Sequence, residues 1–336
     1  MSIPLLLQPQ SIAALYQKFA DETPNALLQF FPDRANAEAG LGIQYDTIEY
    51  GKDVAAVNAR GGLPQMVTPA KRGTVVGHAI TLSEQIYIGP DIIKSMRAPG
   101  SITTGPAAEH IAREIKQLRL RIQKRKALFA AQCLGTASGN LSFTLPGAAS
   151  AETVSLNYQT SPNNHTAIGS AWQTAATDVI ANILTAKTNI AADSGKLATH
   201  MVMNSTTGAY LGANTKIASY LSDVAKDEMR LNGRLSRLCD LDIIYVDDTY
   251  VVESTGTATK FLPDNHVAIL AGDSSDRGML ECAPQSIHAP EGTRGIYFHT
   301  FMEPGINGGV YIQYEYNVFP YLACPDEIVF DTTVAA

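Results

Sequence analysis

One segment, residues 106–134, constrains the fold of this chain more than any other, because it predicts a single uninterrupted helix. Proline occupies its first turn, Gly105 precedes it, Gly135 follows it, and its interior contains neither glycine nor proline. These are the start and stop signals of a helix. At ~1.5 Å per residue the helix is roughly 40 Å long, and we call it the spine helix. Its apolar stripe consists of Ile111, Ile115, Leu118, Ile122 and Phe129.

A helix with one apolar stripe packs against another layer on one side only. We therefore predict that Ile115 and Leu118 are buried against strands around residues 310–318, where an alternating pattern predicts a long strand. The cations of the helix are predicted to occupy the opposite face. They are Arg113, Lys116, Arg119, Lys124, Arg125 and Lys126.

The composition limits the class of protein. The chain has 336 residues, of which 45% are hydrophobic and 17% charged, so it can build a large core beneath a weakly charged surface. Low charge combined with 26 glycines and 17 prolines indicates that part of this surface is buried against other molecules, such as copies of the chain. The net charge of −7 argues against a free-standing nucleic-acid-binding protein, which is usually basic.

Cysteine spacing and hydropathy bear on the compartment. The cysteines are far apart and none belongs to a C-x-x-C pair, which argues against a zinc site and a disulfide scaffold and favours a reducing compartment. The N-terminus has no positive segment before its short apolar run, and no window approaches 18 consecutive apolar residues. We therefore expect a soluble protein made in the cytoplasm, without membrane contact. The cysteines are Cys133, Cys239, Cys282 and Cys324.

The sequence contains none of three common enzyme motifs. G-x-S-x-G, H-E-x-x-H and a complete P-loop are all absent; the tripeptide Ser194-Gly195-Lys196 has Ile190 where a phosphate-binding loop needs glycine. Acids that could bind a metal occur at residues 240–242 and 247–248, but a predicted strand separates the two groups. We predict no catalytic residue, no metal and no cofactor.

The sequence pattern of residues 43–82 predicts an extended arm that projects from the body of the protein. Strands are predicted at residues 43–49, 54–58 and 74–82, with too few apolar side chains for a private core. The arm carries cations without acids between Asp53 and Glu84. The three that we single out are Arg60, Lys71 and Arg72.

The rest of the chain mixes short strands and helices, which is typical of an α+β protein. Helices are predicted at residues 11–21, at 170–193, and at 215–224 with a start within the glycine-rich segment 208–214. Strands are predicted at residues 141–145, 153–158, 199–203, 241–246, 249–253 and 267–271. The C-terminal segment, residues 309–334, predicts a long strand, a kink at Pro320 and a closing strand after Pro325.

Several segments together resemble one known family. Residues 260–265, KFLPDN, precede an apolar strand and a glycine-rich return at residues 272–278, and residues 319–329 read FPYLACPDEIV. The stretches around residues 60–69 and 87–91 are similar to the arm of the same family. In motif content and in the order of elements, nearly the whole chain resembles the lambda-type major capsid protein E family of tailed bacteriophages.

This resemblance implies the Hong-Kong-97-type capsid fold, an α+β fold with a long spine helix, an extended E-loop, an N-terminal arm and an axial domain. The implied domains are an N-terminal arm (1–42), an E-loop (43–82), a peripheral domain (83–194) with spine helix 106–134, an axial domain (195–308) and returning C-terminal strands (309–336).

The implied function is that of a major capsid protein, whose hexamers and pentamers form an icosahedral shell around double-stranded DNA in the virion. The implied partners are other copies, a scaffold, a portal, a decoration protein and packaged DNA. An encapsulin-like compartment shell of the same fold is the alternative.

Two sets of cations are candidate contact sites in such a shell. Arg60, Lys71 and Arg72 on an arm without its own core are expected to contact acids of a neighbouring subunit, the alternative being a solvated loop. The spine-helix cations have three alternatives: a solvated face, contact with acids of a neighbour, or contact with packaged DNA. The representatives of that face are Arg113, Lys116, Arg119 and Lys124.

Overall fold

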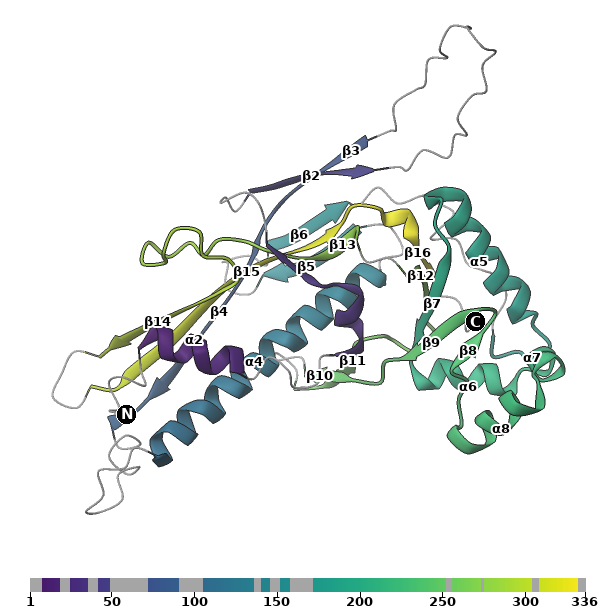
Figure 1. Ribbon diagram of the computed structural model, residues 1–336, viewed down its shortest axis with the longest axis horizontal. Coiled ribbons are helices and arrows are strands. Elements are labelled where there is room, and N and C mark those ends of the chain that lie inside the picture. The colour runs from purple at the N-terminus through teal and green to yellow at the C-terminus, as the bar shows by residue number, and fades with distance from the viewer. Residues whose placement is uncertain are drawn as a thin grey trace, which may run out of the picture. The chain divides into compact units, whose positions relative to one another are not determined.

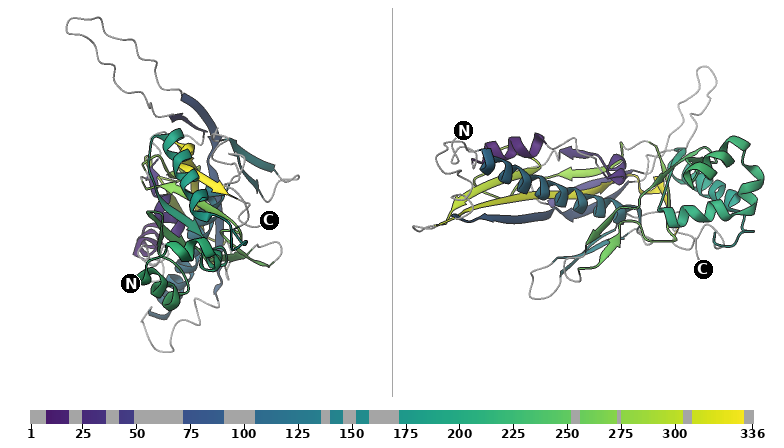
Figure 2. Two further views of the ribbon diagram at one scale, coloured as in Figure 1. Left: turned by 90° about the vertical axis from the view of Figure 1, so that its right-hand side faces the viewer. Right: turned by 90° about the horizontal axis from the view of Figure 1, so that it is seen from below.

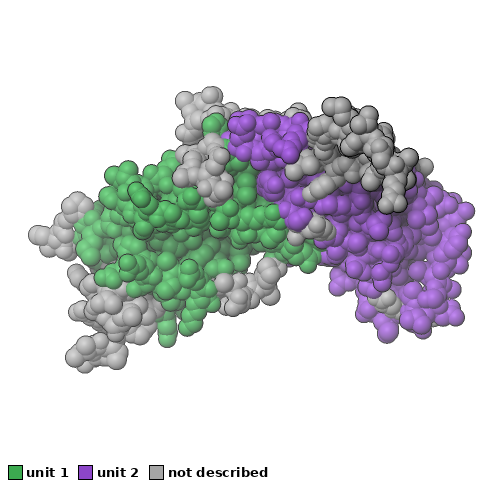
Figure 3. All heavy atoms as spheres, turned by 45° about the horizontal axis from the view of Figure 1, so that its top comes forward, with its two compact units in different colours: residues 1–43, 78–128, 278–320 green, residues 44–77, 129–277, 321–336 purple. Residues whose placement is uncertain are grey.

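The computed structural model is described for the residues whose placement is defined (Figure 1). These are residues 8–18, 25–35, 42–48, 72–90, 105–135, 140–145, 152–157, 172–251, 256–272, 275–303 and 308–331. The chain divides into two compact units, which Figure 3 colours separately. Unit 1 comprises residues 1–43, 78–128 and 278–320, and unit 2 comprises residues 44–77, 129–277 and 321–336. This division does not test the functional domains predicted above, which stay predictions.

Unit 1 is built on a five-stranded sheet whose central strand is β15. β14 pairs antiparallel with one edge of β15 and β4 pairs antiparallel with its other edge, while β13 also pairs with β15 and β1 pairs parallel with β13. The strands are β1 (Asp33–Ala35), β4 (Ile80–Ile88), β13 (Arg277–Glu281), β14 (Ile296–Met302) and β15 (Val310–Leu322).

Two helices cover the sheet of unit 1. The predicted spine helix is confirmed as α4 (Gly105–Leu134), and α2 (Pro9–Lys18) packs on β14 (Figure 2). Ile115 and Leu118 are 0% and 2% exposed, so their predicted burial is confirmed. Arg121, an exposed residue of α4, forms an ion pair with Glu84 of β4, with 2.9 Å between Nη2 and Oε1. This ion pair connects the helix directly to strand β4.

Unit 2 contains a second five-stranded sheet, ordered β16-β12-β7-β9-β8. Strand β12 is buried along its whole length, because β16 and β7 flank it on its two edges and α5 packs against it. The strands are β7 (Ala198–Met203), β8 (Arg237–Leu238), β9 (Leu241–Tyr245), β12 (Val267–Ala271) and β16 (Ile328–Asp331). The helices are α5 (Val179–Ser194), α6 (Ser205–Ala213), α7 (Thr215–Tyr220) and α8 (Asp223–Asn232).

Three two-stranded sheets and two short 3-10 helices complete the described elements. The strand pairs are β2 (Gly42–Ile48) with β3 (Arg72–His78), β5 (Asn140–Leu145) with β6 (Glu152–Asn157), and β10 (Thr249–Val251) with β11 (Ala258–Lys260). The 3-10 helices are η1 (Ala26–Phe30) and η3 (Pro325–Glu327).

The predicted arm strand at residues 74–82 is wrong as a single element. The structure has two strands there, β3 and β4, which meet at Ala79. β3 pairs with β2, while β4 joins the sheet of unit 1, where β15 offers it a nine-residue partner edge. Local β-propensity is continuous across Ala79, so only the choice of pairing partner separates the two strands. The predicted strand at residues 54–58 lies outside the described residues.

Helix boundaries in unit 2 also differ from the prediction. The helix expected at residues 170–193 begins at Val179, because Asp178 caps it by accepting a hydrogen bond from Ala181 N at 3.0 Å. The glycine-rich segment is part of α6, a separate helix capped by Asn204, and the predicted helix 215–224 ends at Tyr220. At the C-terminus, β15 continues through Pro320 to Leu322 instead of ending at a kink.

Candidate assembly surfaces

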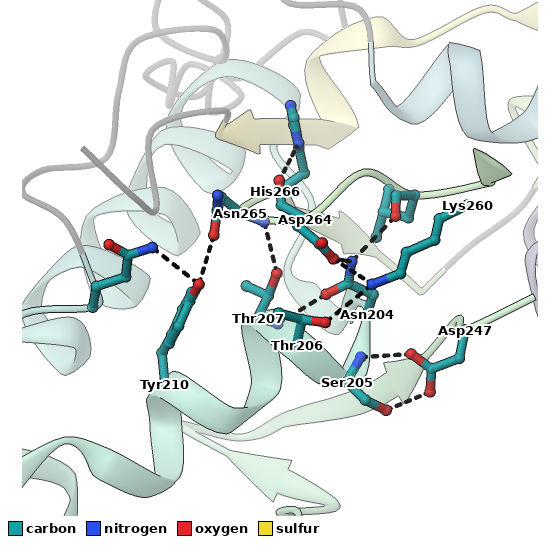
Figure 4. A network of polar contacts seen from close by, with 12 residues as sticks. Asn204, Ser205, Thr206, Thr207, Tyr210, Asp247, Lys260, Asp264, Asn265 and His266 are labelled. Carbon is teal, nitrogen blue, oxygen red and sulfur yellow. Dashed lines mark hydrogen bonds and ion pairs between the residues drawn. The ribbon is translucent and has the colours of Figure 1, made fainter.

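The KFLPDN segment, residues 260–265, closes onto the N-terminus of α6 (Figure 4). Asn204 is fully buried and is the N-cap of this helix: its Oδ1 accepts from Thr207 N at 2.8 Å. Its Nδ2 donates to Leu262 O at 3.2 Å and to Asp264 Oδ1 at 2.6 Å. A single amide thus satisfies the helix end and holds the loop that follows β11 in the sequence.

Two further contacts hold this loop: an ion pair between Lys260 and Asp264, and a backbone hydrogen bond of Asn265, whose backbone is in the left-handed conformation. Lys260 Nζ lies 2.6 Å from Asp264 Oδ1 and 3.0 Å from Thr206 Oγ1, and the hydrogen bond from Lys260 is the main cause that lowers the pKa of Asp264. Asn265 has a φ of 66°, which turns the chain so that its N–H donates to Thr207 Oγ1 at 3.0 Å. This arrangement explains the segment as a structural clasp, which we call the α6 clasp.

The acids considered for metal binding have structural partners. Asp247 accepts hydrogen bonds from both the N–H and the hydroxyl of Ser205; burial raises its pKa, but these bonds hold it below the usual value. At the other end of β9, Arg237 contacts Asp240 at 2.5 Å and Asp242 at 3.5 Å. Within the described part of the chain, no three His, Cys, Asp or Glu side chains gather as a metal would require.

A buried ion cluster ties three distant segments of unit 2 together. Lys196 Nζ lies 2.5 Å from both Asp276 Oδ2 and Glu327 Oε1, and Arg277 Nη1 lies 3.5 Å from Glu327 Oε2. The Arg277 and Glu327 side chains are both 0% exposed. Burial raises the pKa of Glu327, against the lowering effect of Lys196 and Arg277. The lysine of the incomplete P-loop motif is therefore part of the cluster that holds η3, the Pro-Asp-Glu segment.

Two spine-helix cations predicted to face away from the core lie on its border. Arg119 Nη1 donates to Tyr16 O at 2.6 Å and its guanidinium lies 4.4 Å from the centre of the Tyr16 ring, so it fastens α2 to α4. Lys126 is buried and lies 2.6 Å from Asp33 Oδ1, next to Glu281. The prediction is wrong for these two residues. Each follows a residue of the apolar stripe by four positions, a signal that places it beside the stripe.

The remaining candidate cations are more accessible. Arg113 and Lys124 are exposed and Lys116 is half-buried. On the arm, Arg72 lies 3.8 Å from Asp46 of the paired strand, with 69% of its own side chain exposed. Arg60 and Lys71 lie outside the described residues. The structure thus gives Arg72 an acid within its own arm, which the sequence did not predict.

The four thiols are free, and those of Cys133, Cys282 and Cys324 are buried. In unit 1 a cavity of about 500 Å³ lies between α2, α4 and the sheet. Its walls include Arg119, Lys126 and Glu281, which already have the structural contacts described above. None of the described helices combines the length and hydropathy needed to cross a bilayer.

Comparison with solved structures identifies the fold. A protein of an Escherichia coli CFT073 prophage, described as a capsid protein, superposes with a TM-score of 0.66 at 13% identity, over 98% of this chain and 99% of that one. A phage-related protein from Bordetella bronchiseptica RB50 gives 0.56 at 10% identity over 98% and 99%. A structure from Gordonia phage Cozz gives 0.50 at 11% identity over 93% and 87%. The fold is therefore that of phage capsid subunits, the Hong-Kong-97-type fold.

The family follows from the sequence. Residues 22–333 match the family model of phage major capsid protein E, so the chain belongs to this family. No curated protein matches the sequence. Of the two kinds of shell protein considered above, the family match supports the phage major capsid protein over the encapsulin-like alternative.

Proposed function

We propose that this protein assembles with copies of itself into the hexamers and pentamers of an icosahedral shell that encloses double-stranded DNA in the head of a tailed phage. The observation that carries the proposal is the family match over residues 22–333. The subunit is made in the host cytoplasm and ends in the virion. Scaffold, portal and decoration proteins are its further partners.

The work of the subunit in this proposal is mechanical, and it has no catalytic activity. The features that support it are polar contacts within the subunit that join distant segments: the α6 clasp, the buried ion cluster, and the hydrogen bond of Arg119 to α2. They keep each unit rigid, so that energy from subunit contacts is not lost in deforming the subunit. The N-terminal arm, E-loop, peripheral and axial domains take the residue ranges that the resemblance implied.

Electron microscopy of the protein purified alone tests self-assembly. We expect capsomers or closed shells of uniform curvature after concentration at moderate salt. Monodisperse small particles under all conditions, including in the presence of its own scaffold protein, would contradict the proposal.

The arm cations Arg60, Lys71 and Arg72 are proposed to contact acids on a neighbouring subunit. Each exposed pair contributes only ~0.2–1 kcal/mol, but every subunit repeats the contact. We expect the triple change to Glu to leave the subunit folded by circular dichroism and to abolish assembly or make it strongly salt-dependent. The triple change to residues of the same charge, Arg60→Lys, Lys71→Arg and Arg72→Lys, is the control and should assemble. Salt-resistant shells from the Glu variant would show that the arm is a solvated loop.

The spine cations Arg113, Lys116 and Lys124 are proposed to contact either a neighbour's acids or packaged DNA. Replacing all three by Gln distinguishes the two partners. Loss of empty shells would indicate subunit contact, whereas normal shells that retain DNA only at low salt would indicate DNA contact. Normal shells with unchanged DNA retention would leave these residues as a solvated face.

A further inference from the structure

Strand β4 lies at the margin of the sheet of unit 1 (Figure 2). Its nine residues run in continuous register with β15, from Ile80 opposite Val318 to Ile88 opposite Val310. Over the described residues, β15 is the one strand that pairs with β4. β14 pairs with the opposite edge of β15 and does not contact β4 through backbone pairing. One edge of β4 is therefore not used by the sheet.

The register shows which backbone groups point to this edge. Glu303 N donates to Gly309 O at 2.9 Å, and these two residues extend the pairing of Met302 with Val310. In an antiparallel ladder, hydrogen-bonded and non-hydrogen-bonded pairs alternate. Odd-numbered residues of β15 therefore direct their backbone groups to β14, and even-numbered ones direct theirs to β4. The β4 residues that face away from β15 are Thr81, Ser83, Gln85 and Tyr87.

Strand β4 itself, which lies within the described residues, lacks the sequence features that usually protect an open edge against pairing. Proteins guard open edges with short strands, lysine, proline or a bulge. The segment ITLSEQIYI has nine residues, contains no lysine, proline or glycine, and has no register shift against β15. The four outward residues are uncharged, and their eight backbone groups, one N–H and one C=O each, form a template for another strand.

We propose that in the shell β4 pairs, through this edge, with an extended segment of a second copy of this chain. The inference rests on the proposed self-assembly. Backbone pairing gives affinity without selecting for charge, so the neutral edge suits another protein strand and offers no cations for a nucleic acid. In a shell, the molecule that surrounds each subunit at the highest concentration is another copy.

Hydrogen exchange resolved at single residues tests the pairing, with the protein purified alone. The amides of Ser83, Gln85 and Tyr87 should exchange rapidly in the unassembled subunit and at least about tenfold more slowly in shells. The amides of Leu82 and Glu84, which face β15, should be protected in both states and serve as the internal control. Equal exchange of the outward amides in both states, or protection that appears only when a different protein is added, overturns the inference.

A proline pair provides a matched test by substitution. Gln85→Pro removes a donor that points outward, so the ladder to β15 stays intact and the subunit should fold while shell formation falls at least about tenfold. Glu84→Pro, by contrast, removes a donor of the ladder itself and should impair folding. Normal shells from Gln85→Pro contradict the inference; if that variant misfolds, hydrogen exchange of the natural protein decides. Shells with unprotected outward amides refute the pairing alone, whereas the absence of any shell refutes self-assembly and the pairing with it.

Discussion

The buried pair of Arg277 and Glu327 allows a quantitative prediction. Both side chains are 0% exposed and their charged atoms lie 3.5 Å apart. At an effective dielectric constant of about 20, two unit charges at this distance attract by about 5 kcal/mol. Glu327→Gln removes this attraction but leaves the arginine buried, and the loss of one partner of a buried pair costs about 3–5 kcal/mol. We therefore expect this single change to remove a large fraction of the free energy of unfolding, which is about 5–15 kcal/mol for a typical domain.

Two further variants separate the pair from its surroundings. Asp276→Asn leaves Lys196 in contact with Glu327, and because Lys196 and Asp276 are 22% and 15% exposed, we expect a smaller loss of about 1–2 kcal/mol. The double variant Arg277→Met with Glu327→Gln removes both buried charges, so it should be more stable than the sum of the single changes predicts, by at least about 2 kcal/mol.

The assay is equilibrium unfolding of the unassembled subunit in urea, followed by far-ultraviolet circular dichroism at a fixed protein concentration. The linear dependence on urea gives the free energy of unfolding of each variant. A loss below about 1 kcal/mol for Glu327→Gln, or strict additivity in the double variant, would refute the argument that the pair acts as one buried unit.

Three other predictions concern the core, the clasp and the pH dependence. Ile115→Asp buries an unpaired charge and should prevent accumulation of soluble subunit, whereas Gln117→Asp on the exposed face of α4 should not; equal yields would show that the stripe is not buried. Asn204→Ala should cost about 2 kcal/mol in urea unfolding and more than Ser222→Ala, which removes only the exposed cap of α8; the reverse order would contradict the clasp. Burial lowers the pKa of Lys196, but its two carboxylate partners raise it above 10.5 overall, so its stabilisation is present below that pH and is lost above it. The slope of unfolding free energy against pH above 10.5 should therefore be shallower for Lys196→Met, and an unchanged slope would contradict this assignment.

Elements with local signals were predicted well from the sequence. The spine helix was predicted to within one residue, because the glycines at its ends and the 3.6-residue periodicity of its apolar residues are local sequence signals. The buried strand Val267–Ala271 was predicted with its observed bounds for the same reason, a short apolar run between turn residues. Helix α8 was missed although its sequence carries cap residues at both ends, Ser222 and Gly233. Its apolar pattern is mixed, since Ala225 and Met229 pack against the core whereas Val224 and Leu231 are 80% and 84% exposed.

The sequence by itself determined the capsid family, the spine helix and the apolar stripe that α4 buries, since these depend on motif order and on neighbours along the chain. Only the tertiary structure decided where long-range partners meet. Two strands meet at Ala79 because the first, β3, pairs with β2 and the second, β4, pairs with β15. Lys196 contacts Glu327, 131 positions later, because η3 packs against α5. The energy of such contacts depends on burial and distance, and neither quantity is encoded in local residue spacing.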